Sequence, residues 1–151
     1  MNLLHLYVDT AVPSRPTVRI LVDGAETLAA FGDATNTVED ILLSGALLPQ
    51  DPPRRIAFYG CGCGELGCAN VAGLVRRRGG VIEWADFRTV TGAYRGALPI
   101  EDVPDPADDP ETPSRALDLP TLTFEATAYL SVVRAATGVA RLPGARPGGL
   151  G

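Results

Sequence analysis

Residues 54–87 read RRIAFYGCGCGELGCANVAGLVRRRGGVIEWADF and carry the clearest structural signals of the chain. It opens with residues 54–59, a strand pattern with Ile56 and Phe58 on one face. It closes with VIEWADF, residues 81–87, which alternates in the same way and carries the single tryptophan. The Gly-Gly pair at residues 79–80 is typical of a tight turn. We therefore expect a strand, a loop, and then a hairpin whose second strand holds the tryptophan.

The segment before this turn, residues 70–78, allows two interpretations. Val71, Gly73 and Val75 alternate as the residues of a strand do. The apolar residues from Cys68 to Val75 also fit one face of a helix. The turn that follows lies between two alternating runs, so it favours the strand.

The loop YGCGCGELGCAN, residues 59–70, holds all three cysteines of the chain: Cys61, Cys63 and Cys68. Four glycines lie among them, and glycine permits the sharp backbone turns that would point three sulfurs at one spot. Three thiolates suit zinc, which normally takes four protein ligands in a structural site. The sequence therefore predicts a zinc site with three of its ligands in this loop.

The fourth ligand must come from elsewhere in the fold. The only histidine is His5, on a predicted strand that could pair beside the strand preceding the cysteine loop. His5 is thus the candidate fourth ligand, although its position also suits an ordinary strand residue. Asp86 and Glu65 are oxygen alternatives. Three ligands with an open position would instead allow a bound water and hydrolytic chemistry.

Three other interpretations of the loop stay open. Gly62, Gly64 and Gly67 spell G-x-G-x-x-G after a strand, with Asp86 near the position of a ribose-binding acid, as in dinucleotide-binding units. The cysteines could also cycle as redox groups, or serve as small buried side chains in a turn. A Ser-His-Asp hydrolase is poorly supported, because no G-x-S-x-G elbow is present. No residue is assigned a catalytic role.

The rest of the chain supplies further elements. Alternation predicts an antiparallel pair of strands around residues 4–8 and 18–22, followed by a turn at Asp23-Gly24. Residues 25–31 fit either a short helix or a third strand. A short helix is expected over residues 38–44, with Thr37 and Asp40 resembling a capping box and Gly45 at its end.

The C-terminal third combines a proline-rich loop, an edge strand and a helix. Residues 98–113 are rich in proline and acidic residues, which predicts a solvated loop. Residues 119–124 predict an edge strand entered through a proline. Residues 125–137 predict the best helix of the chain, ending at Gly138. Its expected core stripe is Ala126, Tyr129, Leu130 and Val133.

These elements predict an α+β fold with one mostly antiparallel sheet, a short central helix and a C-terminal helix on one face. The length of 151 residues suits one domain, residues 1–141, followed by a disordered tail over residues 142–151. Trp84 shares a strand face with Ile82, and a lone tryptophan in a small domain is expected in the core.

Composition narrows the partners and the compartment. The net charge of −5 argues against nucleic acid as a partner. Since no window approaches the roughly 18 apolar residues of a membrane span, no membrane segment is expected. The first residues lack the pattern of a signal peptide, which indicates a cytoplasmic protein. In that compartment, clustered cysteines are more often ligands or redox groups than disulfides.

The succession of motifs between residues 21 and 136 resembles a family of small, uncharacterised actinobacterial proteins. The shared features are a C-x-C-G-x-x-G-C loop, a hairpin with W-x-x-F, and F-x4-Y at the start of the last helix. In this chain they are Cys61, Cys63, Gly64, Gly67, Cys68, Trp84, Phe87, Phe124 and Tyr129. The resemblance implies a hairpin after the loop, but it carries over no activity and no catalytic residues.

Taken together, the residues predict a small cytosolic, non-enzymatic binding or accessory protein. It would act through a protein partner, and its cysteine loop would hold a structural zinc. The alternative is a small redox or nucleotide-dependent enzyme that uses the same loop. The oligomeric state is left open.

Overall fold

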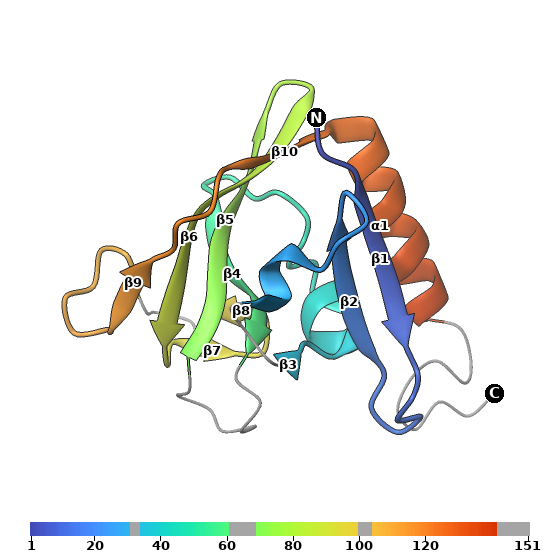
Figure 1. Cartoon of the computed structure of the whole chain (residues 1–151), viewed down its shortest axis with the longest axis horizontal. Helices are drawn as coiled ribbons and strands as arrows, with labels where there is room; N and C mark the ends of the chain where they lie inside the picture. Colours follow the sequence, from blue (N-terminus) through green and yellow to red (C-terminus); the bar gives the residue numbers. More distant parts are fainter. Residues whose placement is uncertain (31–33, 61–68, 100–103, 142–151) are drawn as a thin grey trace.

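The computed structural model describes residues 1–30, 34–60, 69–99 and 104–141. In this part of the chain the strands form one six-stranded sheet and two two-stranded sheets, and an α-helix follows the last strand (Figure 1). The six-stranded sheet has the order β10-β6-β5-β4-β3, with β9 paired to β6. Its strands are β3 (Ala34–Thr35), β4 (Arg54–Gly60), β5 (Ala69–Arg78), β6 (Val81–Thr91), β9 (Ser114–Ala116) and β10 (Leu122–Glu125).

The smaller sheets pair β1 (Leu4–Asp9) with β2 (Thr17–Val22) and β7 (Tyr94–Arg95) with β8 (Leu98–Pro99). The named strand pairs are antiparallel, which confirms the predicted α+β class. The predicted single sheet is wrong, because β1 and β2 form a sheet of their own. Beyond β2, the described residues are connected to this pair only by isolated links, such as the Val18 amide donating to the Asn36 carbonyl.

The hairpin of β5 and β6 is the longest feature of the large sheet. Its turn is closed at Gly79, whose φ of 60° lies in the left-handed region that glycine tolerates. Pairing runs from Arg78 opposite Val81 to Ala69 opposite Thr91. The prediction of a strand over residues 70–78 is confirmed, and the helical alternative is wrong.

Strand β4 is buried on both faces, although the sequence predicted only one. Ile56 and Phe58 join the main core, and Ala57 belongs to a second buried cluster on the opposite face. That cluster consists of Ala57, Ala72, Val90 and Tyr94. The main core covers one face of β4, and the second cluster, which includes Tyr94 of β7, covers the other.

The main core is organised around Trp84, which is fully buried, as predicted. Its ring centroid lies 4.5 Å from that of Phe58 and 4.9 Å from that of Phe124. The indole Nε1 donates to the Tyr129 hydroxyl at 3.0 Å, and that hydroxyl donates to the Leu47 carbonyl at 2.6 Å. The polar atoms of both side chains are thereby satisfied inside the core.

Two short helices lie between β2 and β4. η1 (Thr27–Ala30) is a 3-10 helix, which settles the ambiguous segment after β2 in favour of a helix. η2 (Glu39–Leu43) is a single π-helical turn at the place of the predicted short helix. As expected, the Thr37 hydroxyl accepts the Asp40 amide, at 3.2 Å, and Gly45 ends the turn with a φ of 78°.

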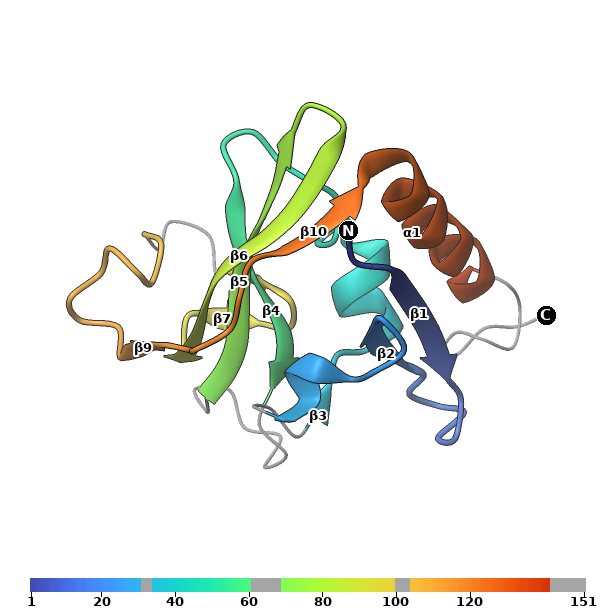
Figure 2. The same cartoon turned by 45° about the horizontal axis from the view of Figure 1, so that its top comes forward.

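Helix α1 (Ala126–Ala140) lies beside β1 in both views (Figures 1 and 2). The Glu125 carboxylate caps it by accepting the amides of Thr127 and Ala128 at 3.1 and 2.7 Å. The predicted stop at Gly138 is wrong, because the helix continues to Ala140. The Ala140 methyl group is buried, and this packing stabilises the last helical turn beyond Gly138. The predicted tail, residues 142–151, lies outside the described residues.

Candidate functional site

The three cysteines predicted to bind zinc, Cys61, Cys63 and Cys68, lie outside the described residues, as does Glu65. The strands that flank their loop pair with each other in antiparallel fashion. Within residues 1–30, 34–60, 69–99 and 104–141, no three His, Asp or Glu side chains gather in a way that could hold a metal ion. The cysteine ligands therefore remain a prediction from the sequence.

His5 lies on β1, opposite Leu21 of β2, and its side chain is exposed. The expectation that its strand pairs beside β4 is wrong. One edge of β4 pairs with β5, and the other pairs with β3 and receives the Asn36 side chain. With both edges of β4 taken, β1 is placed next to α1 instead. The ligand role of His5 stays a prediction, without the strand pairing that suggested it.

The dinucleotide-binding interpretation of the glycines is wrong in its fold. That motif needs a helix directly after the glycine-rich turn, because the helix N-terminus binds the pyrophosphate. Here the loop leads into β5, an antiparallel neighbour of β4. Asp86, the proposed ribose-binding acid, is instead engaged by an arginine of β4.

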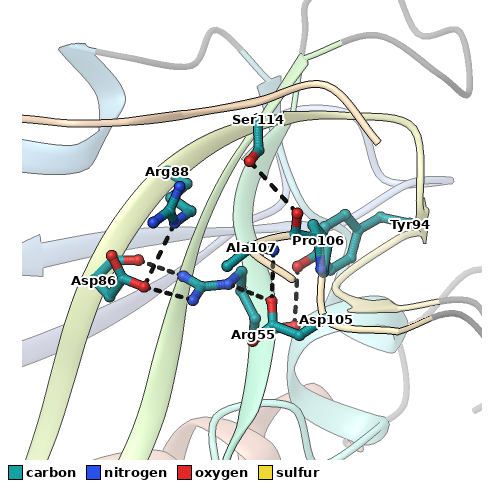
Figure 3. Close-up of polar contacts among 8 residues, drawn as sticks. All are labelled: Arg55, Asp86, Arg88, Tyr94, Asp105, Pro106, Ala107 and Ser114. Atoms are coloured by element: carbon teal, nitrogen blue, oxygen red, sulfur yellow. Dashed lines mark hydrogen bonds and ion pairs between the residues drawn. The ribbon is translucent and has the colours of Figure 1, made fainter. Parts of the chain in front are cut away.

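That arginine is Arg55, a buried cation that the sequence analysis missed (Figure 3). Its side chain is 2% exposed. Nη2 lies 2.7 Å from Asp86 Oδ2, and Nε lies 2.8 Å from Asp105 Oδ1. Nη1 donates to the backbone carbonyl of Asp86. Tyr94 completes the group by donating its hydroxyl to the Arg55 carbonyl at 3.0 Å. A guanidinium with this many partners can remain charged while buried.

Asp86 is held at a β-bulge. The register between β5 and β6 shifts opposite Gly73, and Asp86 has a φ of 50°. The bulge turns Phe87 into the core, where its ring lies over Gly73. A Cβ at Gly73 would lie 2.9 Å from Phe87 Cδ1, so glycine is required for this packing.

The pKa of the Asp86 carboxyl lies below its ordinary value of 3.8. Desolvation opposes its ionisation, but the hydrogen bond and the charge of Arg55 outweigh that effect. Arg88 adds a weaker contact, with Nε 3.5 Å from Asp86 Oδ2. The ion pairs of Arg55 thus connect β4 with β6 and with the segment that carries Asp105.

The ion pair between Arg55 and Asp105 also revises the prediction for the proline-rich loop. Most of residues 104–113 are at least partly exposed, as expected for a solvated segment. Asp105, however, is bound to Arg55, and Pro106 is buried. The available signal was Arg55 itself, directly before the apolar residues 56–59 of the same strand. An arginine in a strand that is buried on both faces needs a counter-charge.

A groove lies between β1 and α1 and is here named the β1–α1 groove. It consists of two adjoining hollows of about 310 and 440 Å³ that share His5 and Val132 in their walls. The strand side carries Leu6, Tyr7 and Val8, and the helix side carries Val132, Ala135 and Val139. Its middle is apolar except for His5.

Large apolar side chains are exposed along this groove. Of the six that are exposed in the described residues, Met1, Leu3, Tyr7 and Val139 line its two hollows. The charged Glu125 lies in the wall of the first hollow, at the start of α1. An apolar surface of this kind with polar groups at its margin is typical of a protein interaction site.

Comparison with the models of protein families, with curated proteins and with solved structures found no match. No helix in the described part of the chain is long and apolar enough to cross a membrane.

Proposed function

We propose that the protein is a non-enzymatic binding protein that holds an apolar segment of a protein partner in the β1–α1 groove. The observation that carries this proposal is the exposure of Met1, Leu3, Tyr7 and Val139 along the two adjoining hollows of this groove. Leaving these side chains in water costs free energy that a partner recovers by covering them, at about 25 cal/mol per Å². A contiguous group of exposed apolar side chains is typical of an interaction surface, whereas single scattered ones are ordinary on any protein.

In this proposal the cysteine loop has a structural role. Cys61, Cys63 and Cys68 hold a zinc ion that orders the connection between β4 and β5, and His5 is the candidate fourth ligand. The protein works in the cytoplasm, where such thiolates stay reduced. The support is the clustering of all cysteines in one glycine-rich loop.

The test compares two exposed valines, one inside the groove and one outside it. Val139 is 48% exposed on α1, and Val12 is 58% exposed between β1 and β2. A photo-reactive amino acid at Tyr7 of the full chain should cross-link a discrete partner in cells. With that partner purified, Val139→Asp should weaken binding at least about tenfold, while Val12→Asp should leave the affinity unchanged. Circular dichroism would show that both variants are folded.

The proposal fails if the two valine variants bind the partner equally well. It also fails if a photo-reactive residue at Val12 yields the same cross-links as one at Tyr7, because the contact would then be unspecific.

A further inference from the structure

We infer that Arg55 is a binding site for the carboxylate group of a ligand, and that Asp105 fills this site from within the chain. Asp105 belongs to residues 104–113, which we name the strap. A carboxylate of another molecule takes the place of Asp105 on the guanidinium, and the strap then leaves the sheet. The site lies outside the β1–α1 groove, and the inference does not rest on the proposed function.

The two carboxylates that meet Arg55 are attached to the fold in different ways (Figure 3). Asp86 lies within β6 between Ala85 and Phe87, which are both buried. It engages Arg55 twice, because its carboxylate accepts from Nη2 at 2.7 Å and its backbone carbonyl accepts from Nη1. Asp105 engages Arg55 once, with Oδ1 2.8 Å from Nε. Departure of Asp105 therefore leaves Arg55 with both contacts to Asp86 and with one counter-charge.

The strap satisfies much of its own backbone. Its four prolines have no amide N–H. Most of its other amides donate to an aspartate of the strap, those of Ala107 and Asp108 to Asp105 and those of Glu111 and Thr112 to Asp109. A backbone bond joins its last residue to the sheet, where the Thr91 amide donates to the Pro113 carbonyl at 2.9 Å. The strap can thus turn away from Arg55 about this end while its internal hydrogen bonds remain.

The exchange preserves the hydrogen bonds of Arg55. The Nε–H that donates to Asp105 donates instead to an oxygen of the ligand, and water hydrates the carboxylate of Asp105. The side chain of Asp105 is already 31% exposed, whereas that of Arg55 is 2% exposed. Asp105 therefore forms the surface end of the pair, which is the position that a dissolved carboxylate can reach.

The charges around Arg55 select the ligand. Arg88 also contacts Asp86, with Nε 3.5 Å from Oδ2. With Asp105 in place, the group holds two guanidinium groups and two carboxylates. When Asp105 leaves, one positive charge is in excess, so the site takes a single negative charge. A carboxylate supplies this charge and matches a guanidinium donor, whereas a phosphate dianion would bring a second charge next to Asp86.

Asp105 acts as a competitor that is built into the chain. Since it is tied to the same chain as Arg55, it competes with a free ligand at an effective concentration on the order of millimolar. The parent protein should therefore bind a free carboxylate weakly, and removal of the Asp105 carboxylate should strengthen binding. If Asp105 served only to stabilise the fold, its removal would create no such gain.

The first experiment compares Asp105→Ala with Asp108→Ala. Both remove one carboxylate of the strap, but Asp108 is exposed and only the first variant removes the partner of Arg55. The NMR signal of the Arg55 Nε–H is followed during titration with sodium acetate, with sodium chloride as the control. Acetate should shift this signal saturably in Asp105→Ala, at a concentration at least about tenfold lower than in the parent protein. Asp108→Ala should behave as the parent does.

The second experiment uses the parent protein, so it does not depend on the folding of a variant. The probe is a peptide with blocked ends and the sequence of residues 104–109, PDPADD. Its matched control has asparagine in place of the first aspartate. The probe should shift the Arg55 Nε–H signal and, over the same concentrations, the amide signals of Ala107 and Asp108 as the strap leaves. The control peptide should shift none of them.

The two probes distinguish the sources of the carboxylate. A response of Asp105→Ala to acetate supports a site for small carboxylates, and a response to the peptide alone supports a site for an acidic protein segment. The inference is overturned if neither probe shifts the Arg55 signal, or if chloride or the control peptide acts as strongly.

The variants test the role of the strap. Equal affinities of the parent and Asp105→Ala for the probe would overturn the inference, because Asp105 would then not occupy the site. An equal gain in Asp108→Ala would overturn it as well, since a general loss of negative charge would be the cause. Val139→Asp in the β1–α1 groove should leave the response of Arg55 unchanged, which separates this site from the proposed function.

Discussion

At the scale of single residues, Arg55 shows how a buried charge is stabilised. Its side chain is 2% exposed, while the carboxylates of Asp86 and Asp105 are 44% and 31% exposed. The cation therefore loses nearly all of its hydration, and its partners keep part of theirs. In such a group the carboxylates mainly prevent the cost of an unpaired buried cation.

This asymmetry predicts that the losses of unfolding free energy caused by substituting Asp86 and Asp105 are not additive. Asp86→Asn or Asp105→Asn alone should cost about 1–2 kcal/mol of unfolding free energy, because one counter-charge remains. Asparagine is also tolerated at the positive φ of residue 86. The double variant should cost more than the sum, about 3–5 kcal/mol, because the guanidinium is then buried without a counter-charge. Urea unfolding of the four proteins measures this, and strictly additive values would contradict it.

The cysteines carry a second prediction at this scale. Protein purified without chelator should contain about one zinc per chain, bound through Cys61, Cys63 and Cys68. Elemental analysis together with thiol titration of the folded protein is the measurement. Cys63→Ser should lower the zinc content well below that of the parent, and His5→Gln tests the fourth ligand. Metal-free protein with three freely titrating thiols would contradict the site.

At the scale of elements, α1 is attached to the large sheet through one polar chain inside an apolar core. Trp84 of β6 donates to the hydroxyl of Tyr129, which donates to the carbonyl of Leu47 just after η2. Two hydrogen bonds inside the apolar core thus connect β6, α1 and the segment after η2. The same contacts fix the inner side of α1, while its outer side lines the β1–α1 groove.

Two substitutions separate packing from hydrogen bonding here. Trp84→Ala should cost about 3–5 kcal/mol, because it removes a large side chain from a packed core. Tyr129→Phe keeps the ring but leaves the indole N–H and a carbonyl unpaired, so we expect a cost of about 1–3 kcal/mol. Denaturant midpoints measure both. The parent should show blue-shifted tryptophan emission, and red, water-like emission would contradict the buried position.

At the scale of the whole molecule, the pKa shifts of the ionisable groups limit the pH range of stability. The pKa values of Asp9, Asp23, Asp86, Asp109 and Glu125 all lie below their ordinary values. A backbone hydrogen bond from Ala11 is the largest cause for Asp9, and one from Ala128 is the largest for Glu125. Burial raises the pKa values of Tyr59, Tyr94 and Tyr129 above the ordinary value of 10.0.

The lowered carboxyl pKa values limit stability at acidic pH, and the raised tyrosine pKa values limit it at alkaline pH. Carboxyl groups with a lowered folded pKa stabilise the protein above their unfolded pKa, and this stability is lost as the pH falls below about 4. Tyrosines with a raised folded pKa stabilise it below their unfolded pKa, and this stability is lost as the pH rises above about 10. Thermal unfolding from pH 2 to pH 11 should therefore give a plateau with two declining flanks. Asp86→Asn should flatten the acid flank, and an unchanged flank would contradict the role of the Arg55 pair.

Local patterns in the sequence were enough to place most elements and to identify a buried side for several of them. Leu4, Leu6 and Val8 alternate, the Gly79-Gly80 pair marks the hairpin, and Thr37 marks the start of η2, because these signals act between residues close in the chain. Trp84 in the core followed from its place on an alternating strand. The cysteine loop stood out by composition alone, and its zinc site remains a prediction of that kind.

The tertiary structure alone decided what each buried side faces. Arg55 meets Asp86 and Asp105 across 31 and 50 positions of chain, and the β1–α1 groove joins the two ends of the sequence. Periodicity reports that a face is covered, but it does not report by which element. The partner is chosen by the packing of the whole chain, where burying apolar area and pairing buried charges must be satisfied together. For the same reason β1 lies beside α1 rather than β4.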